Sequence, residues 1–236
     1  LGINLIVKYV SDTSSMIDLS SQKIGMFYFI INSWTLFLSI IFGVNTIRSD
    51  LDSQVIDQIL SFPIKRIEYL IARILGSFFI VNIYYLLSMA LTTVIFIFSD
   101  DKFIFQWGMF LTFAVMSLSI LSVITLSSLF SMFFNKIFGL VFSMMFCLVI
   151  FIANSTLGTL KFAELFKSLG VLKSLGVGLH FVFPRIGVLG DISGAFLSGQ
   201  SLPFNLFYEG IHFILSYLVL FLFFLFVFKR QENHRP

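Results

Sequence analysis

The sequence predicts an all-helical protein that crosses a membrane several times. Hydrophobic residues make up 58% of the chain, Phe alone occurs 33 times, and only 11% of the residues are charged. A soluble domain of this composition would expose too much apolar surface to water. The apolar residues also gather into long runs, close to the roughly 20 residues that a spanning helix needs. We therefore expect residues 1–236 to form one transmembrane domain.

Five such runs follow one another along the chain, and each is predicted to be a complete spanning helix. They are residues 24–44, 70–98, 105–133, 137–154 and 211–228. Hydroxyl and amide side chains inside them are expected to bond neighbouring helices, at about 1 kcal/mol each or less in lipid. The many serines of the third run fit this packing role, because neither that run nor the next contains a His, Asp or Glu to act as a catalytic base.

A polar interruption between the first two spans predicts a helical elbow at the membrane surface, residues 45–69. Leu51 and Ile59 belong to an apolar series at helical spacing, while Asp and Gln residues fill the other face. Ser49 is expected to cap the first turn of this amphipathic helix, and Pro63 to end it. A second, basic helix then continues without a break into the next span.

The elbow resembles the coupling helix of the permease subunits of type-2 ABC exporters, including permeases associated with multicopper-enzyme maturation. That family's pattern is an acidic residue, Gly-Thr, a Leu-Leu pair, and Pro-x-x-Arg-x-Glu-Tyr-Leu-x-x-Lys. The residues that match it are Asp50, Ile59, Leu60, Pro63, Arg66, Glu68, Tyr69 and Leu70. The chain departs from the pattern at Gln54 and Val55, which replace Gly-Thr, and at Arg73, which stands where Lys is usual. Elsewhere the match is limited to the order of the spans and the loop lengths.

The resemblance implies the membrane subunit of an ATP-driven exporter. Two copies of the chain, or one copy and a homologous permease, would form the pathway, while a separate ABC ATPase subunit would bind ATP and Mg²⁺. This chain has no Walker phosphate loop, so we expect it to carry no cofactor and to be no enzyme. The predicted contacts with the ATPase are Asp50, Leu51, Val55, Ile59, Leu60, Pro63, Arg66, Glu68 and Tyr69. The alternative is a non-transporting membrane scaffold or assembly factor, which needs the same spans but no coupling elbow.

Catalytic, metal and nucleic-acid functions find little support in the sequence. The three histidines are far apart, and no zinc-binding or hydrolase motif occurs, so no metal or catalytic site is predicted. The formal charge of +3 is spread over the loops and leaves no basic patch for nucleic acid. His212 lies one turn inside the last span, where a hydrogen-bonded interfacial histidine is favoured over a pathway residue.

We expect the transport pathway to lie between two copies, lined by the face of the first span that carries Asn32 and Thr35. The spans offer hydroxyls, amides and many Phe, but few charges. Such a lining suits an amphipathic or lipid-like molecule, or an apolar peptide, better than a bare ion, which needs its hydration replaced. The alternative is that the Phe side chains only face lipid and are unrelated to the cargo.

The remaining segments complete the predicted topology. Residues 155–208 are interrupted by Gly and Pro, and are expected to form an outer loop with interfacial helices, one of them at residues 162–169. The chain begins without Met, and residues 1–10 are too short to span, so we expect a preceding helix, the first of six; a cleaved signal peptide is the alternative. Basic residues are densest in the elbow, the short turns on its side and the tail, which predicts a multi-pass protein of the cell membrane with a cytoplasmic C-terminus.

Overall fold

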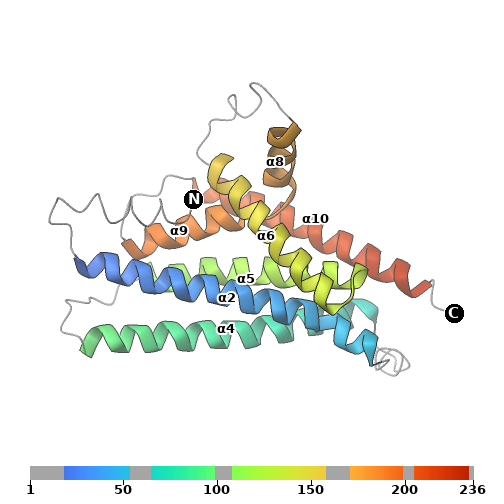
Figure 1. Ribbon diagram of the computed structural model, residues 1–236, viewed down its shortest axis with the longest axis horizontal. Helices are drawn as coiled ribbons and strands as arrows, with labels where there is room; N and C mark the ends of the chain where they lie inside the picture. Colours follow the sequence, from blue (N-terminus) through green and yellow to red (C-terminus); the bar gives the residue numbers. More distant parts are fainter. Residues whose placement is uncertain (1–18, 54–64, 99–107, 158–170, 199–204, 234–236) are drawn as a thin grey trace.

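The computed structural model describes residues 19–53, 65–98, 108–157, 171–198 and 205–233, and all regular structure within these ranges is α-helical. This confirms the predicted all-α fold class. Figure 1 shows the helices in order along the chain. They are α2 (Leu19–Asp52), α4 (Arg66–Phe98), α5 (Gly108–Phe133), α6 (Lys136–Leu157), α8 (Val171–Val182), α9 (Ile186–Ser198) and α10 (Leu206–Asn233).

Five of these helices are long and apolar enough to cross a membrane, as predicted. The candidate spans are Gly25–Asp52, Ile67–Ile95, Gly108–Phe133, Lys136–Asn154 and Leu206–Arg230. Many large apolar side chains on α2, α4, α6 and α10 remain exposed, which is favourable only where the surroundings are hydrocarbon. Together these features indicate a multi-pass membrane protein.

The central helix of the bundle is α5, which contacts α2, α4, α6, α9 and α10. In Figure 1, α2 and α4 run side by side along the long axis of the molecule. The serines on α5 are mostly buried, and Ser127, Ser128 and Ser131 are fully enclosed. Small side chains at these positions let neighbouring helices approach closely, which in lipid is a main source of helix association.

Hydroxyl groups connect the helices to one another, as the sequence predicted. Each bond joins α2 or α5 to α4, α9 or α10. The hydrogen bonds are Thr46 to Ser77 at 2.7 Å, Ser117 to the Asn82 Oδ1 at 2.6 Å, Thr112 to the Ser193 carbonyl at 3.0 Å, and Thr125 to Tyr217 at 3.2 Å. The polar groups of the spans therefore serve packing in this arrangement.

The segment expected to be an outer loop contains two helices, α8 and α9, separated by a bend of 66°. Pro184 lies at the bend, where its missing N–H and fixed φ interrupt the helix. Together the two helices also meet the length and composition requirements of a span, so the bundle has up to six membrane crossings by these criteria. The pair is either a broken span or a re-entrant loop.

Helix α9, which lies in the segment where interfacial helices are predicted, packs inside the bundle. Val188, Ile192 and Ser193 are buried against α5 and α6. Gly187 makes this possible, because a Cβ there would lie 3.0 Å from Asn154 Cβ and 3.2 Å from the Phe151 carbonyl oxygen on α6. The interfacial helix expected at residues 162–169 lies outside the described residues.

Candidate functional site

The polar motif residues that flank the elbow meet in a cluster between the end of α2 and the start of α4. We call Asp50, Tyr69 and Arg73 the elbow cluster. The Tyr69 hydroxyl donates a hydrogen bond of 2.5 Å to Asp50 Oδ2, and Arg73 Nη2 forms an ion pair with Asp50 Oδ1. Asp50 is 7% exposed, so its charge is largely removed from water. Both carboxylate oxygens have charge-assisted partners, which offset much of that desolvation.

The cluster also reaches α10. Tyr69 is buried, and its ring stacks on Phe228 with the ring centroids 6.2 Å apart. Tyr69 and Arg73 are four residues apart on α4, a spacing that puts both side chains on the same face of a helix. Three helices are thereby held together at this end of the bundle.

The structure corrects the predicted start of the elbow. Helix α2 continues through Asp52, and Ser49 lies in its last turn rather than at the cap of a new helix. The Ser49 hydroxyl donates to the Asn45 carbonyl four residues earlier, at 2.8 Å. Ile47 is fully buried and Leu51 packs against the core, so tertiary contacts extend α2 beyond the point where the apolar run ends.

Of the remaining predicted coupling residues, two lie within the described residues and four lie outside them. Glu68 is exposed, and its Oε2 accepts a bond from the Lys65 backbone N–H, which caps the first turn of α4. Arg66 is the first residue of α4. Those that lie outside the described residues are Val55, Ile59, Leu60 and Pro63.

The predicted contacts of Tyr69 and Leu51 with the ATPase stay predictions, and in this arrangement both side chains lie against their own chain. Tyr69 is buried and Leu51 is partly buried on the core of this chain. Sequence reasoning also missed Arg73 as the partner of Asp50, and Phe228 as the partner of Tyr69. Tyr69 and Arg73 are four residues apart and share one face of α4, which was a signal that Arg73 lies beside Asp50. No short-range sequence pattern relates Tyr69 to Phe228.

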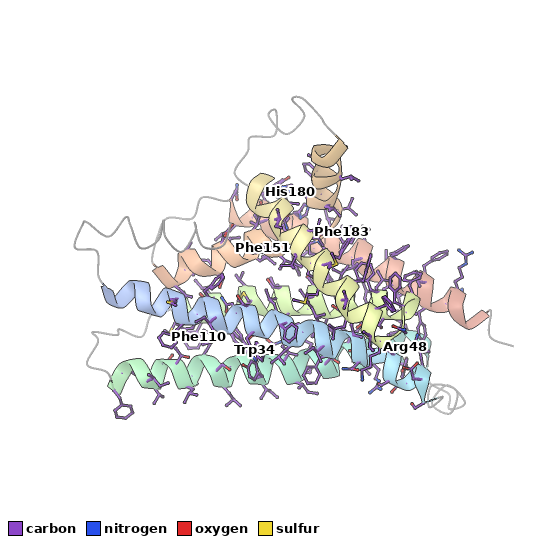
Figure 2. The ribbon with its side chains drawn as sticks, in the orientation of Figure 1. Trp34, Arg48, Phe110, Phe151, His180 and Phe183 are labelled. Carbon is purple, nitrogen blue, oxygen red and sulfur yellow. The ribbon has the colours of Figure 1, made fainter. Side chains whose placement is uncertain are left out.

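The end of the bundle that holds the elbow cluster is rich in basic residues. Arg48 pairs with Asp52 at 2.8 Å, and its Nη1 lies 3.4 Å from the Phe134 carbonyl oxygen in the turn between α5 and α6. Figure 2 shows Arg48 at this end of the molecule. The basic residues of the chain segments that meet here are Arg48, Lys65, Arg66, Arg73, Lys136, Lys229 and Arg230, and the acidic ones are Asp50, Asp52, Glu68 and Glu232.

A second polar cluster surrounds the bend between α8 and α9. We call it the bend cluster, and its members are Asn154, His180, Arg185, Glu209 and His212. Arg185 Nη1 pairs with Glu209 Oε1 of α10 at 2.8 Å, and the two side chains are only 7% and 10% exposed. The guanidinium also lies near the rings of Phe181 and Tyr208, 5.6 and 5.4 Å from their centroids. These contacts surround the buried cation with an opposite charge and two aromatic rings.

The bend cluster also satisfies the backbone at the end of α8. Arg185 Nε donates to the His180 carbonyl at 3.2 Å, and His212 Nε2 donates to the Phe181 carbonyl at 3.0 Å. The last carbonyls of a helix have no partner within the helix, and a cation near them also favours the helix dipole. The hydrogen bond expected for His212 is therefore present, and its acceptor belongs to the bend.

His180 links the bend to α6. Its Nδ1 lies 2.9 Å from Asn154 Oδ1, and both residues are buried. Figure 2 shows His180 and Phe183 beside α6, near the labelled Phe151. The bend cluster thus joins α6, α8, α9 and α10. No local sequence pattern predicts it, since its members are spread over more than fifty positions.

The predicted pathway residues occupy different environments. Thr35 is fully buried, and its hydroxyl donates to the Ile31 carbonyl at 2.7 Å. In this arrangement the Thr35 side chain lies in the interior of its own chain, and its role in a pathway between two copies stays a prediction. Asn32 is partly exposed, and its role in a pathway stays a prediction.

The comparisons with known proteins leave the family of the chain open. No family model matches it, and no curated protein or solved structure is similar to it. Within the described residues, no group of three or more His, Cys, Asp or Glu side chains is placed to hold a metal ion. The elbow residues and their contacts are therefore the candidate functional site.

Replacing Tyr69 by Phe is expected to lower the free energy of unfolding by about 1–3 kcal/mol, because the buried Asp50 Oδ2 loses the hydroxyl that donates to it. The ring contact with Phe228 would remain. Thermal unfolding of the purified chain in detergent measures the effect. Tyr84→Phe is the matched control on the same helix, since no partner is found for that partly exposed hydroxyl among the described residues. Equal losses in the two variants would contradict a special role for the elbow cluster.

Proposed function

We propose that this chain is the membrane-spanning permease subunit of an ATP-driven ABC exporter. A separate ABC ATPase subunit binds ATP and Mg²⁺, and the transport pathway forms between two copies of the chain or between one copy and a homologous permease. The observation that supports this proposal is the elbow cluster. Asp50 and Tyr69 are both residues of the coupling-helix pattern, and they contact each other directly across the elbow.

The proposed mechanism is mechanical. Closure of the ATPase pushes on the elbow, and α4 receives the displacement at its first turn. Because α4 is one helix from Arg66 to Phe98, a push at one end tilts all of it. Asp50 ties the end of α2 to the same turn through Tyr69 and Arg73, so the two helices move as a unit. Rigid-body motion of packed helices is an established way to transmit such a signal.

The charge distribution supports the orientation that this mechanism needs. Basic residues gather at the end that carries the elbow, and cytoplasmic loops are generally enriched in Lys and Arg. Near the end of α10, Lys229 and Arg230 follow Phe228, which contacts Tyr69 of the elbow cluster. The proposal therefore places both the elbow and the C-terminus in the cytoplasm and the spans in the cell membrane. The cargo is proposed to be amphipathic or lipid-like.

Cysteine cross-linking from the elbow is expected to trap an ATP-binding subunit. Single cysteines at Gln54 and Asp57, which lie outside the described residues, are introduced after Cys147 is replaced by Ala. Phe98→Cys is the matched control, because it is exposed at the opposite end of α4. Cross-linked products from membranes that retain ATP-dependent export are identified by mass spectrometry.

The expected product joins residue 54 or 57 to a protein with a Walker phosphate loop, and the Phe98 control gives none. If neither elbow cysteine reaches such a subunit in export-competent membranes, the coupling role is wrong. A non-transporting scaffold or assembly factor is the alternative, and it predicts cross-links to proteins without nucleotide-binding motifs. Both outcomes are distinguishable in the same experiment.

A further inference from the structure

A groove runs between α4 and α5 on the outside of the bundle. Its volume is about 330 Å³. The lining residues are Phe78, Phe79, Asn82, Ile83, Leu86 and Leu87 from α4, with Phe113 and Ser117 from α5. Phe79, Ile83 and Leu87 are 59%, 59% and 61% exposed, so the groove opens sideways from the helix pair. These residues lie near the middle of the α4 span, and the groove therefore faces the hydrocarbon core of the membrane.

The walls of the groove offer nothing that a polar ligand needs. Its two polar side chains bond each other, with the Ser117 hydroxyl donating to Asn82 Oδ1 at 2.6 Å. The amide nitrogen of Asn82 donates to the Phe78 carbonyl at 2.9 Å. A hydroxyl or charged group placed here would lose its hydration without a replacement partner. A hydrocarbon chain has no such cost.

The wall of the groove that Phe113 forms packs against a buried aromatic ring. Tyr85 is fully buried, and its ring stacks on Phe113 with an interplanar angle of 8° and a centroid distance of 5.7 Å. Eight side chains from two adjacent helices line the groove, and six of them are apolar. Its size and chemistry suit a single flexible chain.

We propose that the groove between α4 and α5 binds the alkyl chain of a membrane lipid. The chain enters sideways from the bilayer, and its headgroup stays at the membrane surface. The apolar walls and the internally bonded Asn82 and Ser117 select hydrocarbon over any group that needs hydrogen bonds. This site does not depend on the proposed transport function, since a structural lipid and a transported one would bind by the same contacts.

Photolabelling from within the bilayer tests the proposal. The full chain is reconstituted in vesicles that contain phosphatidylcholine with a diazirine in the middle of one acyl chain, and the adducts are mapped by mass spectrometry after irradiation. The expected result is about tenfold more labelling at Ile83 and Leu87 than at Leu91 and Ile214, which corresponds to preferential occupancy by about 1.4 kcal/mol. These comparison residues are equally exposed, at 63% each, but lie outside the groove.

Two matched variants sharpen the test. Leu87→Trp fills the groove and is expected to remove the excess labelling, whereas Leu91→Trp, one turn further along α4, should leave it unchanged. Thermal unfolding checks that both variants remain folded. Even labelling of all four positions would overturn the proposal, because it indicates only the general lipid shell. A disulfide between two chains that carry Ile83→Cys would also overturn it, since a second copy would then cover the groove.

Discussion

Arg185→Met is expected to lower the free energy of unfolding by about 3–5 kcal/mol, because it leaves the Glu209 carboxylate buried without its partner. The pair is almost fully enclosed, with an Nη1 to Oε1 distance of 2.8 Å. The substitution also removes the donor to the His180 carbonyl at the end of α8. Denaturant or thermal unfolding of the purified chain in detergent, followed by tryptophan fluorescence, measures the loss.

Two controls separate the ion pair from other effects of the substitution. The double variant Arg185→Met with Glu209→Leu carries no unpaired charge, so it is expected to be more stable than either single variant. Asp52→Ala breaks the half-exposed pair with Arg48, and should cost no more than about 1 kcal/mol. If Arg185→Met costs as little as Asp52→Ala, the bend cluster does not stabilise the fold in this way.

Gly43→Ala is expected to be the most disruptive single-methyl addition to α2. A Cβ at Gly43 would lie 2.8 Å from both the Ile124 carbonyl oxygen and Ser127 Cβ on α5. Neither atom is the end of a flexible side chain, so the two helices must separate. The Ser128 hydroxyl, which donates to the Gly43 carbonyl at 2.8 Å, would then lose this contact. We expect destabilisation of about 1–3 kcal/mol from the overpacking.

Gly76→Ala on α4 is the matched control for Gly43→Ala. A Cβ at Gly76 meets no atom within 4 Å. Since Ala is favoured over Gly inside a helix by about 0.5–1 kcal/mol, this change should be neutral or slightly stabilising. Melting temperatures of the two variants, measured side by side in the same detergent, decide the matter. A loss of similar size at both positions would mean that close packing of α2 on α5 is not the cause.

The sequence by itself determined the class of the protein and located the five long apolar helices among the residues that the structure describes. Length and apolar composition decide whether a segment can enter lipid, and both are local properties. The packing role of the hydroxyl groups was predictable for the same reason. A buried hydroxyl in an apolar helix has few partners other than its own backbone and the nearest helix, as Ser128 illustrates by bonding both Ile124 and Gly43.

Only the tertiary structure decided which way the motif residues face. The sequence marked Asp50 and Tyr69 as contacts for another protein, but their partners prove to be each other, Arg73 and Phe228. Helix α2 passed its predicted end because its last turns pack against the core, a contribution that hydropathy along the chain does not contain. These outcomes depend on helix pairs that are distant in sequence.

The bend cluster is the clearest case of contacts that the sequence alone does not predict. Pro184 and the neighbouring glycines predicted an irregular segment, and the chain does bend there. The pairing of Arg185 with Glu209 depends on how the bend before α9 packs against α10, and no spacing rule relates the two residues. The sequence therefore determines which segments are helical and apolar, whereas the packing of those helices determines which buried charges meet. The reason is that an unpaired charge is costly only once neighbouring helices have excluded water from it.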